Sequence, residues 1–274
     1  MADQILPSFS LKGKHVLITG GAGILGRHFC FGLAEAGANL TIVDLNAKES
    51  IDLATEVSHK YNIKAISISG DISSPDFVSK LVEQSSAELG DIHVLHNNAA
   101  TKTNDLNAFL APYEEYSLET WKDVMNVNID AMFLMTQAVG KHMIENEISG
   151  SIIQTCSIYG IMGPDQRIYE GSNYMGSPIS SPGSYSASKA AVHGLTQYLA
   201  SYWGEKNIRV NSLTPGGCES GQNETFLKNY SKRIPLGRMA KQHEMVGALI
   251  YLASDASSYV NGHNLVIDGG LNSW

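Results

Sequence analysis

The sequence predicts an α/β fold: a doubly wound parallel sheet of about seven strands with helices on both faces. Short apolar runs alternate with amphipathic stretches from residue 14 onward, which is the pattern of strands alternating with helices. The runs are continuous in Val, Ile and Leu, as in strands buried on both faces of a parallel sheet. No linker, repeat or break in composition divides the 274 residues. We therefore expect one domain over residues 1–274.

The expected elements follow one another in chain order. Strands are predicted at KHVLIT, NLTIVD, KAISIS, DIHVLHNNA, GSIIQTCS, NIRVNSLT and HNLVID. A helical pattern, GILGRHFCFGLAEAG, follows the first strand, and a longer polar helix after the second ends near Tyr61. Pro75, which comes directly after two serines, marks the start of a third helix. Further helices are expected around 118–146 and 184–206.

Composition and charge exclude several classes of protein. The formal net charge is −8 and no basic run occurs, so we expect no nucleic-acid or membrane partner. The first residues lack a secretory pattern, and no stretch has the roughly 20 apolar residues that span a bilayer. Cys30, Cys156 and Cys218 lie far apart and show no metal-ligand spacing. They predict reduced thiols in a cytoplasmic protein and no metal site.

A glycine-rich turn follows the first predicted strand. Gly21-x-Gly23-x-x-Gly26 lies where that strand meets a helix, and such glycines let the backbone approach a pyrophosphate at the helix N-terminus. Asp44 ends the second strand about 20 residues later, the spacing expected of an acid that binds a ribose 2′-hydroxyl. Its carboxylate would repel the 2′-phosphate of NADP, so NAD is the predicted cofactor. The alternative is that Asp44 only caps a turn.

Tyr185 and Lys189 are the ends of the segment YSASK. They are four residues apart in a helical pattern, so their side chains lie on one face. An ammonium group beside a phenol favours the phenolate, and we expect Lys189 to lower the pKa of Tyr185 toward neutrality. The phenol could then exchange protons with a substrate. By itself, such a pair is also ordinary helix-surface geometry.

These features occur together with other short motifs in one order. The motifs are Asp71 in GDIS, Asn97–Ala100 in NNAA, Asn128 in NVNIDAMF, Ser157 in TCSIYG, Pro215–Gly216, and Asp268–Gly270. With them, the chain resembles the short-chain dehydrogenase/reductase family over nearly its whole length. The resemblance implies a single NAD-binding Rossmann domain and an oxidoreductase activity.

The resemblance also implies roles for individual residues. Ser157 would hydrogen-bond the substrate oxygen, and Tyr185 would exchange its proton. Lys189 would hold the nicotinamide ribose, and Asn128 would anchor a water that relays protons. These four are the predicted catalytic residues. The predicted cofactor-binding residues are Gly20, Gly23, Ile24, Leu25, Gly26, Asp44, Leu45, Asp71, Ile72, Asn98, Ala99, Ala100, Tyr185, Lys189, Pro215, Gly216 and Ser220.

The chain departs from the family pattern in three places. Ile24 stands where most relatives carry glycine, and the middle glycine is one residue earlier, a spacing more like the extended branch of the family. Ala100 ends the NNAA motif where glycine is usual. Ser157 and Tyr185 are farther apart than in most relatives, and segment 160–183 holds the extra length.

Two loops, 160–183 and 216–237, are expected to cover the substrate. The first is dense in polar and aromatic residues, which suits a hydroxylated ligand better than a steroid or an acyl chain. Its alternative role is closure over a neighbouring subunit. The predicted substrate-binding residues are Lys102, Tyr159, Arg167, Tyr169 and Asn223. The two loop sequences are also similar to oxidoreductases of bacterial surface-glycan and flagellin-modification pathways of the legionaminic-acid type, which implies an amino-sugar or sugar-phosphate substrate.

The leading interpretation is an NAD-dependent oxidoreductase that interconverts a secondary alcohol and a ketone on a polar, sugar-like substrate. One alternative is a general carbonyl or 3-oxoacyl-type reductase, against which the polar loop and Asp44 argue. The other is a catalytically idle NAD-binding module. An idle relative tends to lose part of the Ser157, Tyr185 and Lys189 set, and this chain has all three.

Self-association is expected through two of the predicted helices. Helices 118–146 and 184–206 correspond by resemblance to dimer interfaces that pair into tetramers. Met132, Met135, Tyr198 and Trp203 are interpreted as outward-facing on them. A homodimer or homotetramer is therefore predicted, with ordinary core packing of these side chains as the alternative.

Overall fold

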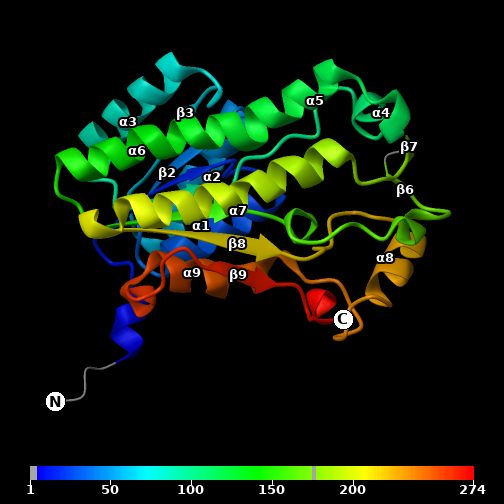
Figure 1. Ribbon diagram of the computed structural model, residues 1–274. Helices are drawn as coiled ribbons and strands as arrows, with labels where there is room; N and C mark the ends of the chain where they lie inside the picture. The colour runs from blue at the N-terminus through cyan, green and yellow to red at the C-terminus, as the bar shows by residue number, and fades with distance from the viewer. Residues whose placement is uncertain (1–4, 175–176) are drawn as a thin grey trace.

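A seven-stranded parallel sheet forms the centre of the computed structural model, which describes residues 5–174 and 177–274 (Figure 1). The strand order is β3-β2-β1-β4-β5-β8-β9, and every neighbouring pair is parallel. Each predicted apolar run overlaps one strand, so the predicted fold class is confirmed. The strands are β1 (His15–Thr19), β2 (Asn39–Asp44), β3 (Ala65–Ser69), β4 (Val94–Asn97), β5 (Gly150–Thr155), β8 (Ile208–Pro215) and β9 (Asn264–Ile267).

Helices cover both faces of the sheet (Figure 1). One face carries α1 (Ile24–Glu35), α2 (Ala47–Tyr61) and α9 (Val246–Ala253), and the other carries α3 (Pro75–Leu89), α6 (Ala131–Glu145) and α7 (Gly183–Trp203). Shorter helices are α4 (Leu106–Phe109), α5 (Leu118–Met125) and α8 (Glu224–Ser231). No helix within the described ranges is long and apolar enough to cross a membrane.

Local sequence sets where the early helices begin. The Asn46 side chain accepts a hydrogen bond from Glu49 N at 3.2 Å and caps α2. The Ser74 hydroxyl caps α3 in the same way, with Pro75 at the first helical position as predicted. Asn62, in the left-handed region at φ 54°, ends α2. Parallel pairing places the carboxyl ends of β2 and β3 at one edge of the sheet, and α2 and α3 begin shortly after those ends.

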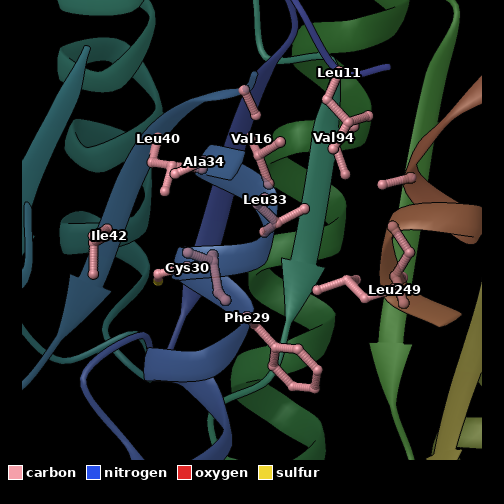
Figure 2. Packing of buried hydrophobic residues seen from close by; sticks show 14 of the residues in the cluster. Leu11, Val16, Phe29, Cys30, Leu33, Ala34, Leu40, Ile42, Val94 and Leu249 are labelled. Atoms are coloured by element: carbon pink, nitrogen blue, oxygen red, sulfur yellow. The ribbon is translucent and has the colours of Figure 1, made fainter. Parts of the chain in front are cut away.

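The hydrophobic core lies in two layers, one on each side of the sheet. Figure 2 shows part of the first, in which Phe29 and Leu33 of α1 and Leu249 of α9 lie against strand residues such as Val16 and Val94. All five are essentially inaccessible to solvent. The second layer joins β1, β4, β5 and β8 to α3, α6 and α7. Burial on both sides explains why the central strands have continuous apolar sequences.

The predicted helix over 118–146 is interrupted. Residues Asn126–Asp130 form a π-helical turn, η3, between α5 and α6. A π turn inserts one residue per turn relative to the α-helix, and such turns occur frequently at functional sites. Its central residue, Asn128, is fully buried. The Asn128 side chain contacts α7 through Ser188.

The outward orientation predicted for three residues of these helices is wrong. Met132, Met135 and Trp203 are buried, packed among the other apolar residues beneath α6 and α7. Only Tyr198 of the four is exposed, at 62%. All four are large and apolar, so residue type did not distinguish the inner face from the outer one. The packing of both helices on the sheet decides which side is buried.

Strand order determines where a cleft can form. The chain moves outward from β1 to β2 and β3, then crosses to β4 on the other side of β1. The loops that follow β1 and β4 therefore diverge, and ligands of such sheets bind in the crevice that opens there, at the carboxyl ends. Two segments lie beyond this edge: the predicted 160–183 loop and the segment that carries α8. The loop contains two short strands, β6 (Asn173–Tyr174) and β7 (Ser177–Pro178), which pair with each other. Residues 175 and 176 of that loop lie outside the described ranges.

Candidate active site

A cavity of about 590 Å³ lies at the carboxyl ends of the strands. It runs from the turn after β1, past the ends of β2 and β3, to the ends of β5 and β8. Every residue predicted to bind the cofactor lines it, from Gly20 to Ser220, together with Ser157 and Lys102. The structure thus brings these residues together around one space large enough for a ligand. Their roles in binding stay predictions.

The glycine turn fits a close backbone approach. Gly20 has φ +64°, and a Cβ there would lie 2.8 Å from the Cα of Ala99. A Cβ at Gly26 would lie 2.0 Å from the carbonyl oxygen of Gly20. Gly23 is the residue before α1, and Ile24, which replaces the usual glycine, is its half-exposed first residue. The helix N-terminus therefore lines the cavity, where its free N–H groups suit a pyrophosphate.

Asp44 stands at the edge of the cavity nearest the turn. Its Oδ2 accepts a hydrogen bond from Ala22 N at 3.0 Å, and its Oδ1 accepts from Asn46 N at 3.0 Å. The carboxylate therefore does cap a turn, the alternative raised from the sequence. It is also partly exposed and lines the cavity, so the cap leaves room for contact with a ribose hydroxyl, which stays a prediction. The bond to Ala22 N fixes the carboxylate relative to the glycine turn.

The ends of β1 and β4 are tied together beneath the cavity. Thr19 Oγ1 accepts hydrogen bonds from Asn98 N at 3.1 Å and Ala99 N at 3.2 Å. The Asn98 side-chain amide donates to the carbonyl of Gly20 at 3.1 Å. The predicted Asn98–Ala100 segment therefore lies against the glycine turn, although the two are far apart in sequence.

Ser157, Tyr185 and Lys189 meet at the other end of the cavity. Ser157 precedes the short turn η4 (Ile158–Gly160), and its hydroxyl is hydrogen-bonded to the phenol of Tyr185. Tyr185 lies in the first turn of α7, and Lys189 lies one turn later. The Lys189 Nζ is 6.0 Å from the centre of the Tyr185 ring and donates to the carbonyl of Thr155 at 2.8 Å. All three line the same cavity as the glycine turn.

The expected lowering of the Tyr185 pKa by Lys189 is wrong in this structure. Burial raises the pKa of Tyr185 above its usual value, and the hydrogen bond from Ser157 offsets this only in part. Burial also lowers the pKa of Lys189 to about 8. The reason is that the cost of desolvating each charged form exceeds the attraction between a phenolate and an ammonium whose nitrogen is turned toward Thr155. Tyr185 is therefore a neutral phenol near neutral pH.

Asn128 does not line the cavity but supports two segments that do. Its Oδ1 accepts from Thr101 N at 3.0 Å, and its Nδ2 donates to Ser188 Oγ at 3.1 Å. Ser188 in turn donates to the carbonyl of Tyr185 at 2.9 Å. The π turn therefore links the loop after β4 to the helix that carries the tyrosine and lysine. Its role in a proton relay stays a prediction.

The predicted substrate residues divide into two groups. Lys102 is exposed and lines the cavity. Tyr159 is instead hydrogen-bonded to Tyr169 of the first loop and to Tyr230 of the second. Arg167 pairs with Asp165 at 2.8 Å, with 80% of its side chain exposed, and Asn223 caps α8 through Phe226 N at 3.0 Å. None of these last four lines the cavity, so direct contact with substrate stays a prediction for them.

The cavity also contains residues that sequence reasoning missed. They are Ala22, Val43, Glu49, Gly70, Thr101, Val127, Thr155, Cys156 and Cys218. Most are neighbours of the predicted residues, and the motifs could have been extended by one position to find them. Glu49 is different, because it belongs to the first turn of α2 and reaches the cavity only because the Asn46 cap places that turn beside Asp44. It joins Asp44 and Asp71 as a third acidic residue that lines the cavity.

Comparisons with known proteins show which proteins this chain is similar to. A family model described as enoyl-(acyl carrier protein) reductase matches residues 21–272. The 2-dehydro-3-deoxy-D-gluconate 5-dehydrogenase of Dickeya dadantii is 35% identical over 97% of this chain and 98% of its own. A solved gluconate 5-dehydrogenase of Burkholderia cenocepacia in complex with NADP and tartrate has a TM-score of 0.86 and 32% identity, covering 99% of this chain and 100% of its own.

A short-chain dehydrogenase of Leptospira borgpetersenii with bound NAD⁺ gives a TM-score of 0.84 at 30% identity, over 96% of this chain and 94% of its own. None of these names concerns a surface-glycan pathway, and the relatives include one solved with NADP and one with NAD⁺. The family model covers nearly the whole chain, including the glycine turn, Ser157, Tyr185 and Lys189. The chain therefore belongs to the short-chain dehydrogenase/reductase family.

Proposed function

We propose that this protein is an NAD-dependent oxidoreductase that interconverts a secondary alcohol and a ketone on a hydroxylated carboxylic acid of the sugar-acid class. The observation that carries the proposal is one continuous cavity with a glycine turn at one end and Ser157, Tyr185 and Lys189 at the other. A dinucleotide lying along that cavity would place its reactive end beside the phenol. Relatives named for gluconate and 2-dehydro-3-deoxy-D-gluconate support the substrate class.

The residues divide the proton chemistry between them. The bound nicotinamide supplies or accepts the hydride. In the direction of reduction, the neutral phenol of Tyr185 donates its proton to the carbonyl oxygen of the substrate. The hydroxyl of Ser157, already hydrogen-bonded to Tyr185, donates to the same oxygen and stabilises the charge that develops on it. In the direction of oxidation, Tyr185 has to take a proton, so loss of the phenolic proton limits that direction near neutral pH.

The charges in the cavity support NAD over NADP. Asp44 and Glu49 stand at the end where the adenosine ribose of a dinucleotide would lie. A 2′-phosphate there would meet two carboxylates. Among the described residues that line the cavity, the basic ones are Lys102 and Lys189, and Lys189 belongs to the catalytic end. The Asp44 carboxylate, held in place by Ala22 N, remains available to accept from a ribose hydroxyl.

Lys102 supports an anionic substrate. It directly follows Ala100 and Thr101 in the loop after β4, and both of these residues also line the cavity. Thr101 N is bonded to Asn128, which also contacts the helix of Tyr185 and Lys189. We propose that its ammonium group binds the carboxylate of a sugar acid while the hydroxyl groups of the substrate face Ser157 and Tyr185. A phosphate group of a sugar phosphate would meet the same charge, so the charge alone does not separate these two classes.

The test is NADH formation from NAD across a panel of sugar acids, neutral polyols, amino sugars, sugar phosphates and simple secondary alcohols, with 3-oxoacyl thioesters assayed in the reductive direction. We expect the highest kcat/KM for a sugar acid. Lys102→Met should raise KM for that substrate by about fivefold or more and leave KM for a neutral polyol unchanged. Lys12→Met, at an exposed lysine away from the cavity, is the matched control.

Other outcomes identify the alternatives. Turnover confined to amino sugars or sugar phosphates would support the surface-glycan hypothesis instead. Turnover only of simple alcohols or acyl thioesters would support a general carbonyl or acyl reductase, the class that the description of the family model names. NAD binding without turnover across the whole panel would support an idle binding module.

We also propose that the protein forms a dimer or tetramer in the cytoplasm. Phe133 and Ile144 of α6 and Tyr198 and Tyr202 of α7 are exposed and line a shared groove. The two tyrosine rings stack at 5.7 Å, and apolar surface of this kind favours association. The three cysteines are free thiols, which supports a reducing compartment. Sedimentation velocity at micromolar concentration should show a dimer or larger species, and a lone monomer would contradict the assembly.

A further inference from the structure

Three tyrosines from three separate segments meet beside the catalytic residues. The phenol of Tyr159 is hydrogen-bonded to the phenols of both Tyr169 and Tyr230. Tyr169 is also bonded to the Ser181 side chain, and Tyr230 to the backbone of Gly217. Tyr169 and Ser181 belong to the 160–183 loop, whereas Gly217 and Tyr230 belong to the 216–237 loop. Tyr159 is therefore the junction at which the two loops are joined.

Ring packing supports the same junction. Tyr169 stacks on Phe226 with ring centres 5.8 Å apart, and Phe226 packs on Tyr230 at 5.4 Å. Aromatic pairs of this geometry add to the energy of burial. Asp165 of the first loop forms an ion pair with Arg233 of the second. The two loops therefore share an apolar contact, a phenol network and an ion pair.

The junction is connected to the catalytic serine. Tyr159 N donates to Ser157 Oγ at 3.2 Å, and that same hydroxyl is bonded to Tyr185. The turn η4 lies directly on α7, since a Cβ at Gly160 would come within 2.7 Å of the Lys189 carbonyl. A shift of Tyr159 would therefore move the turn that positions Ser157 against Tyr185.

Little free volume remains where Tyr159 and Tyr230 meet. The void beside Tyr159, Tyr230, Asp165 and Arg233 is about 10 Å³, which holds one water at most. Burial raises the pKa of all three phenols, so each keeps its proton near neutral pH and the network persists. What the junction can do is hold the loops and the Ser157 turn in one arrangement.

We propose that Tyr159 is a positioning residue, whose hydroxyl joins the 160–183 and 216–237 loops to the turn that carries Ser157 and so keeps Ser157 in register with Tyr185. Tyr169 and Tyr230 are the two arms of this junction. The effect of Tyr159 on turnover rests on the proposed oxidoreductase function. Its effect on the loops does not, because the loop contacts are present whatever the substrate is.

The test is Tyr159→Phe, which keeps the ring and removes the shared hydroxyl. We expect kcat on the best substrate to fall by about 10-fold to about 100-fold. A displacement of Ser157 by up to about 1 Å would have an effect of this size. The Kd of NADH, measured by fluorescence, should stay within twofold of the wild type. Tyr259→Phe, at a fully exposed tyrosine, is the matched control. An unchanged kcat in Tyr159→Phe would overturn the proposal.

Hydrogen–deuterium exchange provides a readout that does not depend on turnover. Amides of residues 160–174 and 216–237 should exchange faster in Tyr159→Phe than in Tyr259→Phe, while amides of β1 and β4 stay unchanged. Equal exchange in both variants would overturn the junction even if no substrate is found. Faster exchange in an enzyme without turnover on any substrate would support the junction and contradict only the proposed function.

A double-mutant cycle separates a shared network from general destabilisation. If Tyr159 and Tyr230 act through one hydrogen-bonded unit, the double variant Tyr159→Phe/Tyr230→Phe should lose about as much kcat as Tyr159→Phe alone. Losses in kcat that simply multiply would indicate independent effects and contradict the network. Should Tyr159→Phe fail to fold, Tyr230→Phe keeps the central hydroxyl and removes one arm, and it should still accelerate exchange in 216–237.

Discussion

Replacing Tyr185 with phenylalanine is expected to lower kcat/KM by about 10²- to 10⁴-fold, the range that positioned acid–base groups contribute. In the proposed function the phenol is the acid that meets the substrate oxygen, and the ring that remains cannot donate a proton. Ser157 would keep its hydroxyl in the cavity but lose its bond to the phenol. Steady-state assays in both directions measure the loss, and the Kd of NADH should change little because phenylalanine keeps the ring and every other residue that lines the cavity is unchanged.

The pH dependence of the wild-type rate is a second test of Tyr185. Because burial raises the pKa of Tyr185, the phenol is protonated near neutral pH. Reduction should therefore be independent of pH around neutrality, whereas oxidation should speed up as the pH rises and more phenolate forms. Tyr185→Phe should abolish the rise, and Tyr259→Phe should preserve it. A variant at Tyr185 that kept wild-type turnover would exclude it as the acid.

Replacing Asp44 with asparagine is expected to change the cofactor preference. The ratio of kcat/KM with NAD to kcat/KM with NADP should fall by about 10²-fold, which corresponds to about 2.7 kcal/mol. Two unit charges about 4 Å apart interact by about 4 kcal/mol at an effective dielectric constant near 20, and the partial exposure of Asp44 reduces this. Asparagine keeps an oxygen that can accept from Ala22 N, so the turn should persist.

Two further variants make this test specific. Glu49→Gln should change the ratio in the same direction but less, because Glu49 is exposed on the first turn of α2. Asp52→Asn, at an exposed carboxylate of the same helix that does not line the cavity, should leave it unchanged. A wild-type enzyme that uses NADP as well as NAD would contradict the proposed preference.

Much of the fold followed from local sequence. Each central strand is buried on both faces, so its run of Val, Ile and Leu was visible without knowledge of its neighbours. The start of α3 at Pro75 was equally local, because capping and proline geometry act within one turn. The Cβ contacts at Gly20 and Gly26 explain why the glycine turn was recognisable, since any side chain there would collide with backbone.

Residues around the cavity could be predicted from the sequence where they belong to a motif. Residues outside the motifs could not. Cavity-lining positions such as Asp71 and Pro215 came from motifs at strand ends, and parallel strands bring those ends together at one edge of the sheet. Arg167 was predicted as a basic residue of the first loop and Asn223 as a polar residue of the second, and the structure uses them for an ion pair and a helix cap. Polar residue type does not reveal which partner a side chain finds.

The sequence by itself determined the order of strands and helices, the glycine turn with Asp44, and the identity of Ser157, Tyr185 and Lys189. Each of these depends on interactions within a few residues or on a motif of fixed spacing. The tertiary structure alone decided which faces of α6 and α7 are buried, that Tyr159 joins two loops, and that the pKa of Tyr185 is raised rather than lowered. Those properties depend on burial and on partners distant in the chain, and neither desolvation nor the direction in which Lys189 points is encoded in the four-residue spacing of YSASK.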